Sequence, residues 1–133
     1  MNLSATRIVT DDVDRLAAFY ETVTGTAPTR LHELFAELRT PTGTLAIASS
    51  RTVPAMGPGV AEAGANRSVL LDFLVDDVDA AYERLRPVLD DVVREPADMP
   101  WGNRSLLLRD PDGNLVNLFA PLDAAARARV TAP

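Results

Sequence analysis

The chain has 133 residues, of which 47% are hydrophobic and 24% charged, the usual balance of a globular domain. It contains no cysteine, which excludes disulfides and thiolate metal ligands, and its net charge of −6 disfavours nucleic-acid binding, which normally needs a basic patch. The N-terminal residues lack the pattern of a signal peptide, and no apolar run is long enough for a membrane span. We therefore expect a cytoplasmic protein without a nucleic-acid or membrane partner.

The first predicted elements are a strand and a helix that recur later in the chain. Residues 9–14 (VTDDVD) return 65 positions on as residues 74–79 (LVDDVD). In both copies apolar residues follow at helical spacing, so each copy predicts an amphipathic helix with aspartates at its N-terminus. Gly25 ends the first helical pattern and Pro87 ends the second.

A second pair of matching segments predicts two β-hairpins. Residues 40–45 (TPTGTL) correspond to residues 110–115 (DPDGNL) at an offset of 70. Both read as turns, because proline presets φ and glycine accepts a positive φ. The strands that these turns join are 34–39 with 45–48 and 105–109 with 115–119.

Each copy therefore consists of a strand, a helix and two or three further strands. The first module spans residues 1–50 and the second 66–121, with a linker at 51–65 that is rich in Pro, Gly and Ala. The tail, 122–133, has room for a short helical turn. Neither module alone has enough core to be stable, so we expect a single α+β domain, 1–133, in which both share one core.

The repeat and its turns resemble the vicinal oxygen chelate superfamily, which contains glyoxalase I, extradiol dioxygenases and drug-binding proteins of the bleomycin-resistance type. The segments that carry the resemblance are 9–20, 75–82, 100–104 (PWGNR) and 110–114 (DPDGN). The resemblance implies two tandem βαβββ modules whose mixed sheets form a U-shaped trough. It also implies a homodimer, often with residues of the partner at the mouth of the site.

The resemblance provides a test for a metal site. In metal-dependent members, His and Glu ligands lie seven residues before the aspartate that opens each helix and four residues after each hairpin glycine. The residues at these positions are Ala5, Leu70, Ile47 and Asn117. None is a strong metal ligand, a slip of one residue supplies none, and the single histidine, His32, lies elsewhere. We therefore expect no metal and no other cofactor.

Strand alternation predicts a pocket on the face that carries these four positions, because residues two apart share a face. The residues assigned to this face are Ala5, Arg7, Leu45, Ile47, Leu70, Asp72, Asn117 and Phe119. A mostly apolar lining with a few polar groups is typical of small-molecule sites. The alternative is a trough filled by its own side chains.

Three further residues are candidate ligand contacts at the entrance of the trough. Trp101 lies in a Pro-Trp-Gly turn, where drug-binding members can stack a tryptophan on a planar ligand, although the same residue can simply pack at the rim. Phe35 and His32 lie at the matching entrance of the first module. The resemblance to dimeric members suggests that they meet Trp101 across a dimer.

The leading hypothesis is non-catalytic binding and sequestration of a planar, partly apolar small molecule, as in antibiotic self-resistance. No catalytic residue is assigned, because the chain has no Gly-x-Ser-x-Gly elbow and no Gly-rich phosphate loop. One alternative is a metal-free isomerase, cyclase or lyase that uses Asp72, Glu37 or His32 as its acid–base group. Less expected are a metal-dependent lyase or dioxygenase and a protein that acts only through protein contacts.

Overall fold

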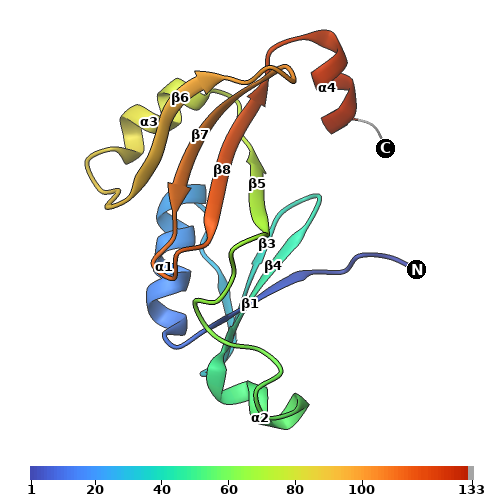
Figure 1. Cartoon of the computed structure of the whole chain (residues 1–133), viewed down its shortest axis with the longest axis vertical. Coiled ribbons are helices and arrows are strands. Elements are labelled where there is room, and N and C mark those ends of the chain that lie inside the picture. Colours follow the sequence, from blue (N-terminus) through green and yellow to red (C-terminus); the bar gives the residue numbers. More distant parts are fainter. Residues whose placement is uncertain (132–133) are drawn as a thin grey trace. The chain divides into compact units, whose positions relative to one another are not determined.

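The computed structural model describes residues 1–131 and divides the chain into two compact units (Figure 1). The first unit comprises Met1–Asn66 together with Pro111–Gly113, and the second comprises Arg67–Asp110 and the described residues from Asn114 onward. Each unit contains a four-stranded mixed sheet with a helix packed against it. The predicted α+β pair of βαβββ modules is therefore confirmed.

The first module consists of β1 and α1 followed by three strands. Their bounds are β1 Thr6–Thr10, α1 Val13–Thr24, β2 Thr29–His32, β3 Phe35–Arg39 and β4 Thr44–Ser49. The strand order is β1-β4-β3-β2, with β1 parallel to β4 and the other pairs antiparallel. A short 3-10 turn, η1 (Ser50–Thr52), and the one-turn helix α2 (Val53–Met56) follow.

The second module repeats this topology. Its elements are β5 Leu70–Leu74, α3 Val78–Leu85, β6 Val92–Asp98, β7 Asn103–Arg109 and β8 Leu115–Pro121. The strand order is β5-β8-β7-β6, again with the first strand parallel to the last. The helix α4 (Ala124–Thr131) occupies the region where the sequence predicts a helical turn.

The helices begin where the repeated aspartates predict. The Asp12 carboxylate accepts the Arg15 backbone N–H at 3.0 Å, and Asp77 accepts that of Ala80 at the same distance. Gly25 ends α1 with a φ of +73°, a conformation that favours glycine. Within residues 1–131, no helix combines the length and apolar character required to span a membrane.

Each module has a core between its helix and one face of its sheet. In the first, Leu16 and Tyr20 of α1 are buried with Leu38 and Ile47 of the sheet. In the second, α3 packs on β6, β7 and β8, and the fully buried residues include Leu85, Leu106, Leu108 and Leu118. These apolar side chains occupy alternate strand positions, which leaves the other positions on the opposite, open face.

The sequence did not locate β2 and β6, which are the edge strands opposite β1 and β5. All four β2 residues are exposed, and the β2–β3 register shifts between Arg30 and His32. The β6–β7 register shifts twice, and β6 contains Pro96, a residue confined to edges and bulges in sheets. Such irregularities remove the alternation that identifies a strand in a sequence.

The two hairpin turns differ by one residue, and this corrects the predicted lining. Arg39 pairs with Thr44 across residues 40–43, whereas Arg109 pairs with Leu115 across residues 110–114. When the two modules are aligned on Gly43 and Gly113, the strands that follow are therefore out of step by one residue. Side chains at aligned positions then lie on opposite faces of the two sheets. Ile47 and Leu45 were therefore wrongly assigned to the open face: Ile47 is fully buried and Leu45 nearly so, on the side of α1.

Candidate functional site

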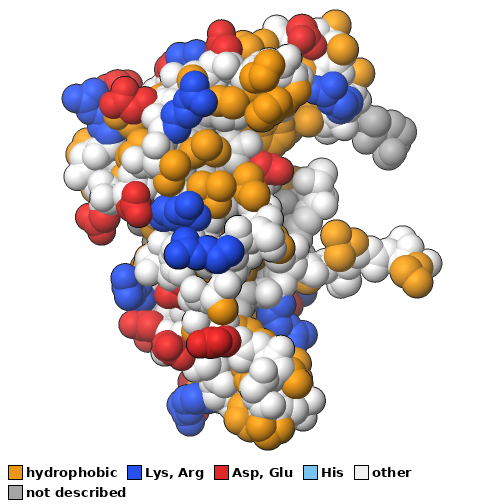
Figure 2. All heavy atoms as spheres, in the orientation of Figure 1, with side chains coloured by type: hydrophobic (Ala, Val, Ile, Leu, Met, Phe, Trp, Pro, Cys, Tyr) orange, Lys and Arg blue, Asp and Glu red, His pale blue; other side chains and the backbone are white. Residues whose placement is uncertain are grey.

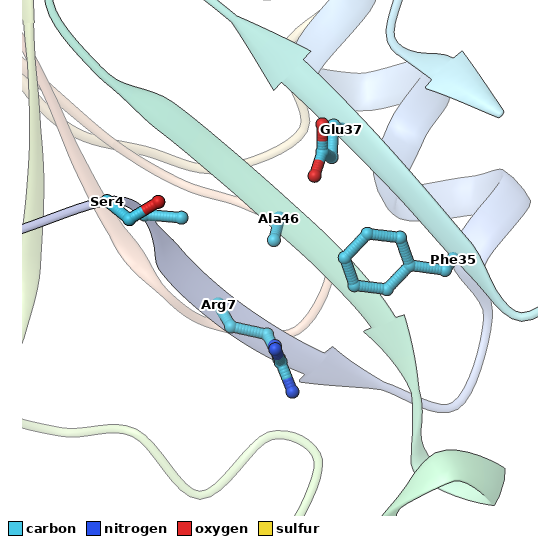
Figure 3. A pocket seen from close by; sticks show the side chains of 6 residues that line it. Ser4, Arg7, Phe35, Glu37 and Ala46 are labelled. Atoms are coloured by element: carbon cyan, nitrogen blue, oxygen red, sulfur yellow. The ribbon is translucent and has the colours of Figure 1, made fainter. Parts of the chain in front are cut away.

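The open face of the first sheet is hollowed into a pocket of about 550 Å³ (Figure 3). Its lining comprises Ser4, Ala5, Arg7, Phe35, Glu37 and Ala46. Strand pairing explains why they meet, because Arg7 of β1 lies opposite Ala46 of β4, and Ala46 lies opposite Glu37 of β3. The small Ala46 side chain forms the floor between two longer charged ones, and this difference in size creates the hollow.

Arg7 is held at one side of the pocket by an aromatic ring. Its guanidinium carbon lies 5.8 Å from the centroid of the Phe35 ring, within the range of a cation–π contact. Its Nη1 lies 3.7 Å from the Sδ atom of Met56 in α2, a weak acceptor. Among residues 1–131, no carboxylate lies within ion-pair distance of this guanidinium. Most of its N–H groups therefore remain available to a ligand.

Glu37, on the other side, is engaged within its own strand. Its Oε2 atom accepts a hydrogen bond from Arg39 Nε at 3.0 Å and lies 2.8 Å from Arg39 Nη2 in an ion pair. The two positions are two apart in β3, so both side chains leave the same face of the sheet. The Glu37 charge is thus compensated by Arg39, whose own side chain is mostly exposed.

His32 lies outside the pocket lining. Its Nδ1 atom accepts the backbone N–H of Leu34 at 3.2 Å, which ties the imidazole to the turn between β2 and β3. The side chain is exposed at the end of an edge strand. A contact between His32 and a ligand or a partner chain stays a prediction.

The open face of the second sheet carries a different set of side chains. Asn117 Nδ2 donates to the Asp72 carboxylate at 2.9 Å, while the buried Asn117 Oδ1 has no hydrogen-bond partner among the described residues. On the same face of β5, Leu70 and Leu74 are 48% and 53% exposed, and Phe119 of β8 lies opposite Leu74. Figure 2 shows apolar patches between charged side chains over this module. The predicted residues Leu70, Asp72, Asn117 and Phe119 thus share one face.

Trp101 lies in the turn between β6 and β7 and is 61% exposed. The turn requires Gly102, because φ is +94° there and a Cβ atom would lie 2.7 Å from Asp123 Oδ2. The Trp101 carbonyl accepts a hydrogen bond from Arg129 Nη2 at 2.9 Å. The turn is well anchored, and stacking of the indole on a ligand stays a prediction.

The residues at the metal-ligand positions do not fit a divalent cation. In the first module these positions are Ala5 and, after the register correction, Ala46 instead of Ile47. In the second they are Leu70 and Asn117, and the Asn117 amide is hydrogen-bonded to Asp72. No group of three or more His, Asp or Glu side chains within the described part of the chain is placed to hold a metal ion.

The pocket combines predicted and unpredicted residues. Arg7 and Phe35, both named from the sequence, line it together, whereas Ile47 does not. The sequence named Glu37 only as an acid–base candidate and did not identify Ala46 or Ser4 as lining. No sequence signal identified Ala46, because the one-residue difference between the two turns appears only in the pairing of the strands.

The chain is similar to known proteins in sequence and in fold. A family model described as the Glyoxalase/Bleomycin resistance protein/Dioxygenase superfamily matches residues 2–118. A glyoxalase/bleomycin resistance protein/dioxygenase from Nocardioides is 27% identical, with a TM-score of 0.76 over 93% of this chain and 85% of that chain. A protein of unknown function from Agrobacterium tumefaciens is 25% identical, with a TM-score of 0.77 over 92% and 95% of the two chains.

A family enzyme from Burkholderia phytofirmans has a TM-score of 0.79 at 22% identity, over 92% of this chain and 100% of that chain, a likeness of fold alone. Among curated proteins, no sequence is significantly similar to the chain.

Proposed function

The chain belongs to the glyoxalase/bleomycin resistance protein/dioxygenase superfamily, and from that premise we propose that it binds a planar, partly apolar small molecule without transforming it. The binding site is the pocket on the open face of the first module. The molecule is of the planar antibiotic type, and binding protects by withholding it from its target.

The pocket beside the Arg7–Phe35 contact is the observation that carries this proposal. Phe35 offers an aromatic face next to a floor that consists of the Ala46 methyl group. Aromatic rings favour offset stacking with other flat rings, so a planar ligand gains both buried area and specific geometry here. A volume of about 550 Å³ lies within the range of small-molecule pockets.

The acid–base candidates support binding over catalysis. A general acid or base must reach the reacting proton with a free lone pair or a free proton. Of the three candidates Glu37, Asp72 and His32, only Glu37 lines the pocket, and its Oε2 atom is paired with Arg39. The second candidate function, a metal-free isomerase or lyase, is favoured only by the position of Glu37 in the pocket lining. It predicts turnover that the substitution Glu37→Gln abolishes.

The test is calorimetric titration of the full chain with a panel of planar antibiotics, followed by mass spectrometry of each recovered compound. We expect saturable binding of at least one compound with its mass unchanged. Phe35→Ala removes this binding, whereas Phe119→Ala, the same change in the second module, retains it. A recovered compound of altered mass, or binding that depends on Phe119 and not on Phe35, contradicts the proposal.

A further inference from the structure

Resting on the proposed function, we propose that the first-module pocket selects planar ligands that carry an anionic group, a carboxylate or an acid of similar strength. Arg7 is the residue that pairs with this group. The flat part of the ligand lies against Phe35 and Ala46, and its anionic substituent points toward β1.

The first step is the state of the Arg7 side chain. Arg30, Arg39, Arg86 and Arg104 form ion pairs with aspartate or glutamate, and Arg39 is the one beside the pocket. Within residues 1–131, the Arg7 guanidinium contacts the Phe35 ring and the Met56 sulfur and forms no ion pair. A guanidinium has five N–H donors in a planar fork that matches a carboxylate, so an unpaired one in a pocket is suited to binding an anion.

The second step is the charge balance of the pocket. Glu37 is the other charged residue of the lining, and Arg39 already pairs with it through a hydrogen bond and an ion pair. The remaining local charge is the positive charge of Arg7, although the whole chain carries a net charge of −6. A cationic ligand would have to compete with Arg39 for Glu37. An anionic ligand would find Arg7 without a competing carboxylate.

The third step is geometry. Arg7 and Glu37 lie on one cross-strand row with Ala46 between them, so their backbones are separated by two strand spacings, roughly 10 Å. Figure 3 shows Arg7 on β1 and Phe35 reaching from β3 over the same hollow. A fused two-ring system spans this floor while its substituent reaches the guanidinium. The orientation of the ligand is therefore fixed by charge at one end and stacking in the middle.

The experiment compares three probes of equal shape, namely 2-naphthoate, 2-naphthamide and 2-naphthylmethylammonium, by calorimetry on the full chain. We expect naphthoate to bind about tenfold more tightly than the amide, since a charge-assisted hydrogen bond outweighs a neutral one. Arg7→Gln should abolish this preference, and Arg7→Lys should retain part of it because lysine keeps the charge without the bidentate fork. In nitrogen-15 NMR spectra, the Arg7 Nε–H signal should shift with naphthoate only.

Two variants serve as controls. Arg30→Gln removes the same charge from the same module, on a residue that pairs with Asp14 of α1, and should leave naphthoate affinity unchanged. Arg39→Gln leaves Glu37 uncompensated and should weaken naphthoate binding while strengthening that of the ammonium probe.

The possible outcomes separate the two proposals. If amide and naphthoate bind equally and Phe35→Ala abolishes both, the anion preference is wrong and the proposed binding function stands. Tighter binding of the ammonium probe than of naphthoate would also show that the anion preference of Arg7 is wrong, while the proposed binding function stands. If neither these probes nor the planar antibiotics bind, both proposals fail.

Discussion

The two modules share one topology and differ on the open faces of their sheets. In the first, the central row is Arg7, Ala46 and Glu37; in the second, the corresponding row is Asp72, Asn117 and Leu107. The middle position is a methyl group in one and an amide that hydrogen-bonds its neighbour in the other. The charge on the first strand is reversed. A repeated backbone thus presents two chemically distinct surfaces.

The helix side of the sheets is alike in both modules. A first-turn aspartate pairs with an arginine from the sheet in each case: Asp14 with Arg30 of β2, and Asp79 with Arg104 of β7. The N-capping aspartates occupy equivalent positions as well. The repeat therefore keeps the helix caps and an Asp–Arg pair on the helix side, although the arginine comes from non-equivalent strands, and it varies the open face.

The largest expected effect tests the register difference between the modules. Ile47→Asn buries an amide in the core of the first module and should destabilise the fold by about 4 kcal/mol, from lost packing and an unpaired polar group. Ala46→Asn introduces the amide that the second module has at this position. It should cost less than Ile47→Asn because Ala46, although only 3% exposed, faces the pocket. Urea unfolding followed by circular dichroism measures both. Greater destabilisation by Ala46→Asn would refute the assigned faces.

The next effect concerns the reversed charge on the first strand of each sheet. Arg7→Asp gives the first module the charge of the second and should lower naphthoate affinity about a hundredfold, since an attraction becomes a repulsion. The opposite change, Asp72→Arg, should create no naphthoate site, because the Asn117 side chain occupies the middle position. Calorimetry on both variants provides the comparison. Gain of binding in Asp72→Arg would show that charge alone, without the hollow, is sufficient.

A smaller effect separates the two helix-to-sheet ion pairs. Arg104 makes two hydrogen bonds to Asp79 and one to Asp98, whereas Arg30 makes one to Asp14. We expect Arg104→Gln to lower the urea midpoint more than Arg30→Gln does, because the bidentate pair loses more contacts. Equal midpoints in the two variants would contradict this difference. Midpoints equal to that of the unchanged chain would mean that neither pair contributes measurably, as is common for exposed ion pairs.

The smallest effect is a pH dependence confined to the second module. Tyr82 donates a hydrogen bond to Glu95 Oε1 at 2.9 Å, and this bond raises the pKa of Tyr82 above 10.0. The folded state therefore holds the phenolic proton more tightly than the unfolded state does. The resulting stability is complete below the unfolded pKa and is lost as the pH rises through the folded pKa. Glu95→Gln should lower the pKa of Tyr82, measured by carbon-13 NMR of the tyrosine ring; an unchanged value would contradict this assignment.

The sequence predicted most of the fold because its signals are local. The aspartate caps, Gly25 and the paired turns determine their elements within a few residues, and the structure confirms them. The face of β4 could not be obtained in the same way. The face that a β4 side chain takes depends on how many residues lie between the paired residues Arg39 and Thr44. This turn is one residue shorter than the turn between Arg109 and Leu115, and an alignment on the turn glycines does not show the difference.

The candidate site was predicted only in part for the same reason. Arg7 and Phe35 were identified from the sequence, and both line the pocket. Ile47 was misplaced by one position, and the pairing of Glu37 with Arg39 is a property of side-chain conformations that no spacing reveals. The hollow itself depends on the small size of Ala46 opposite Arg7, which has meaning only once the strands are paired.

The central claim is that ligand binds on the open face of the first module and not of the second. An NMR titration of the full chain with 2-naphthoate tests it most directly, with backbone and arginine side-chain signals assigned. We predict that the largest shifts fall on Arg7, Phe35 and Ala46, with Asp72 and Asn117 unaffected. Shifts centred on Asp72 and Asn117 would place the site in the second module and contradict the account.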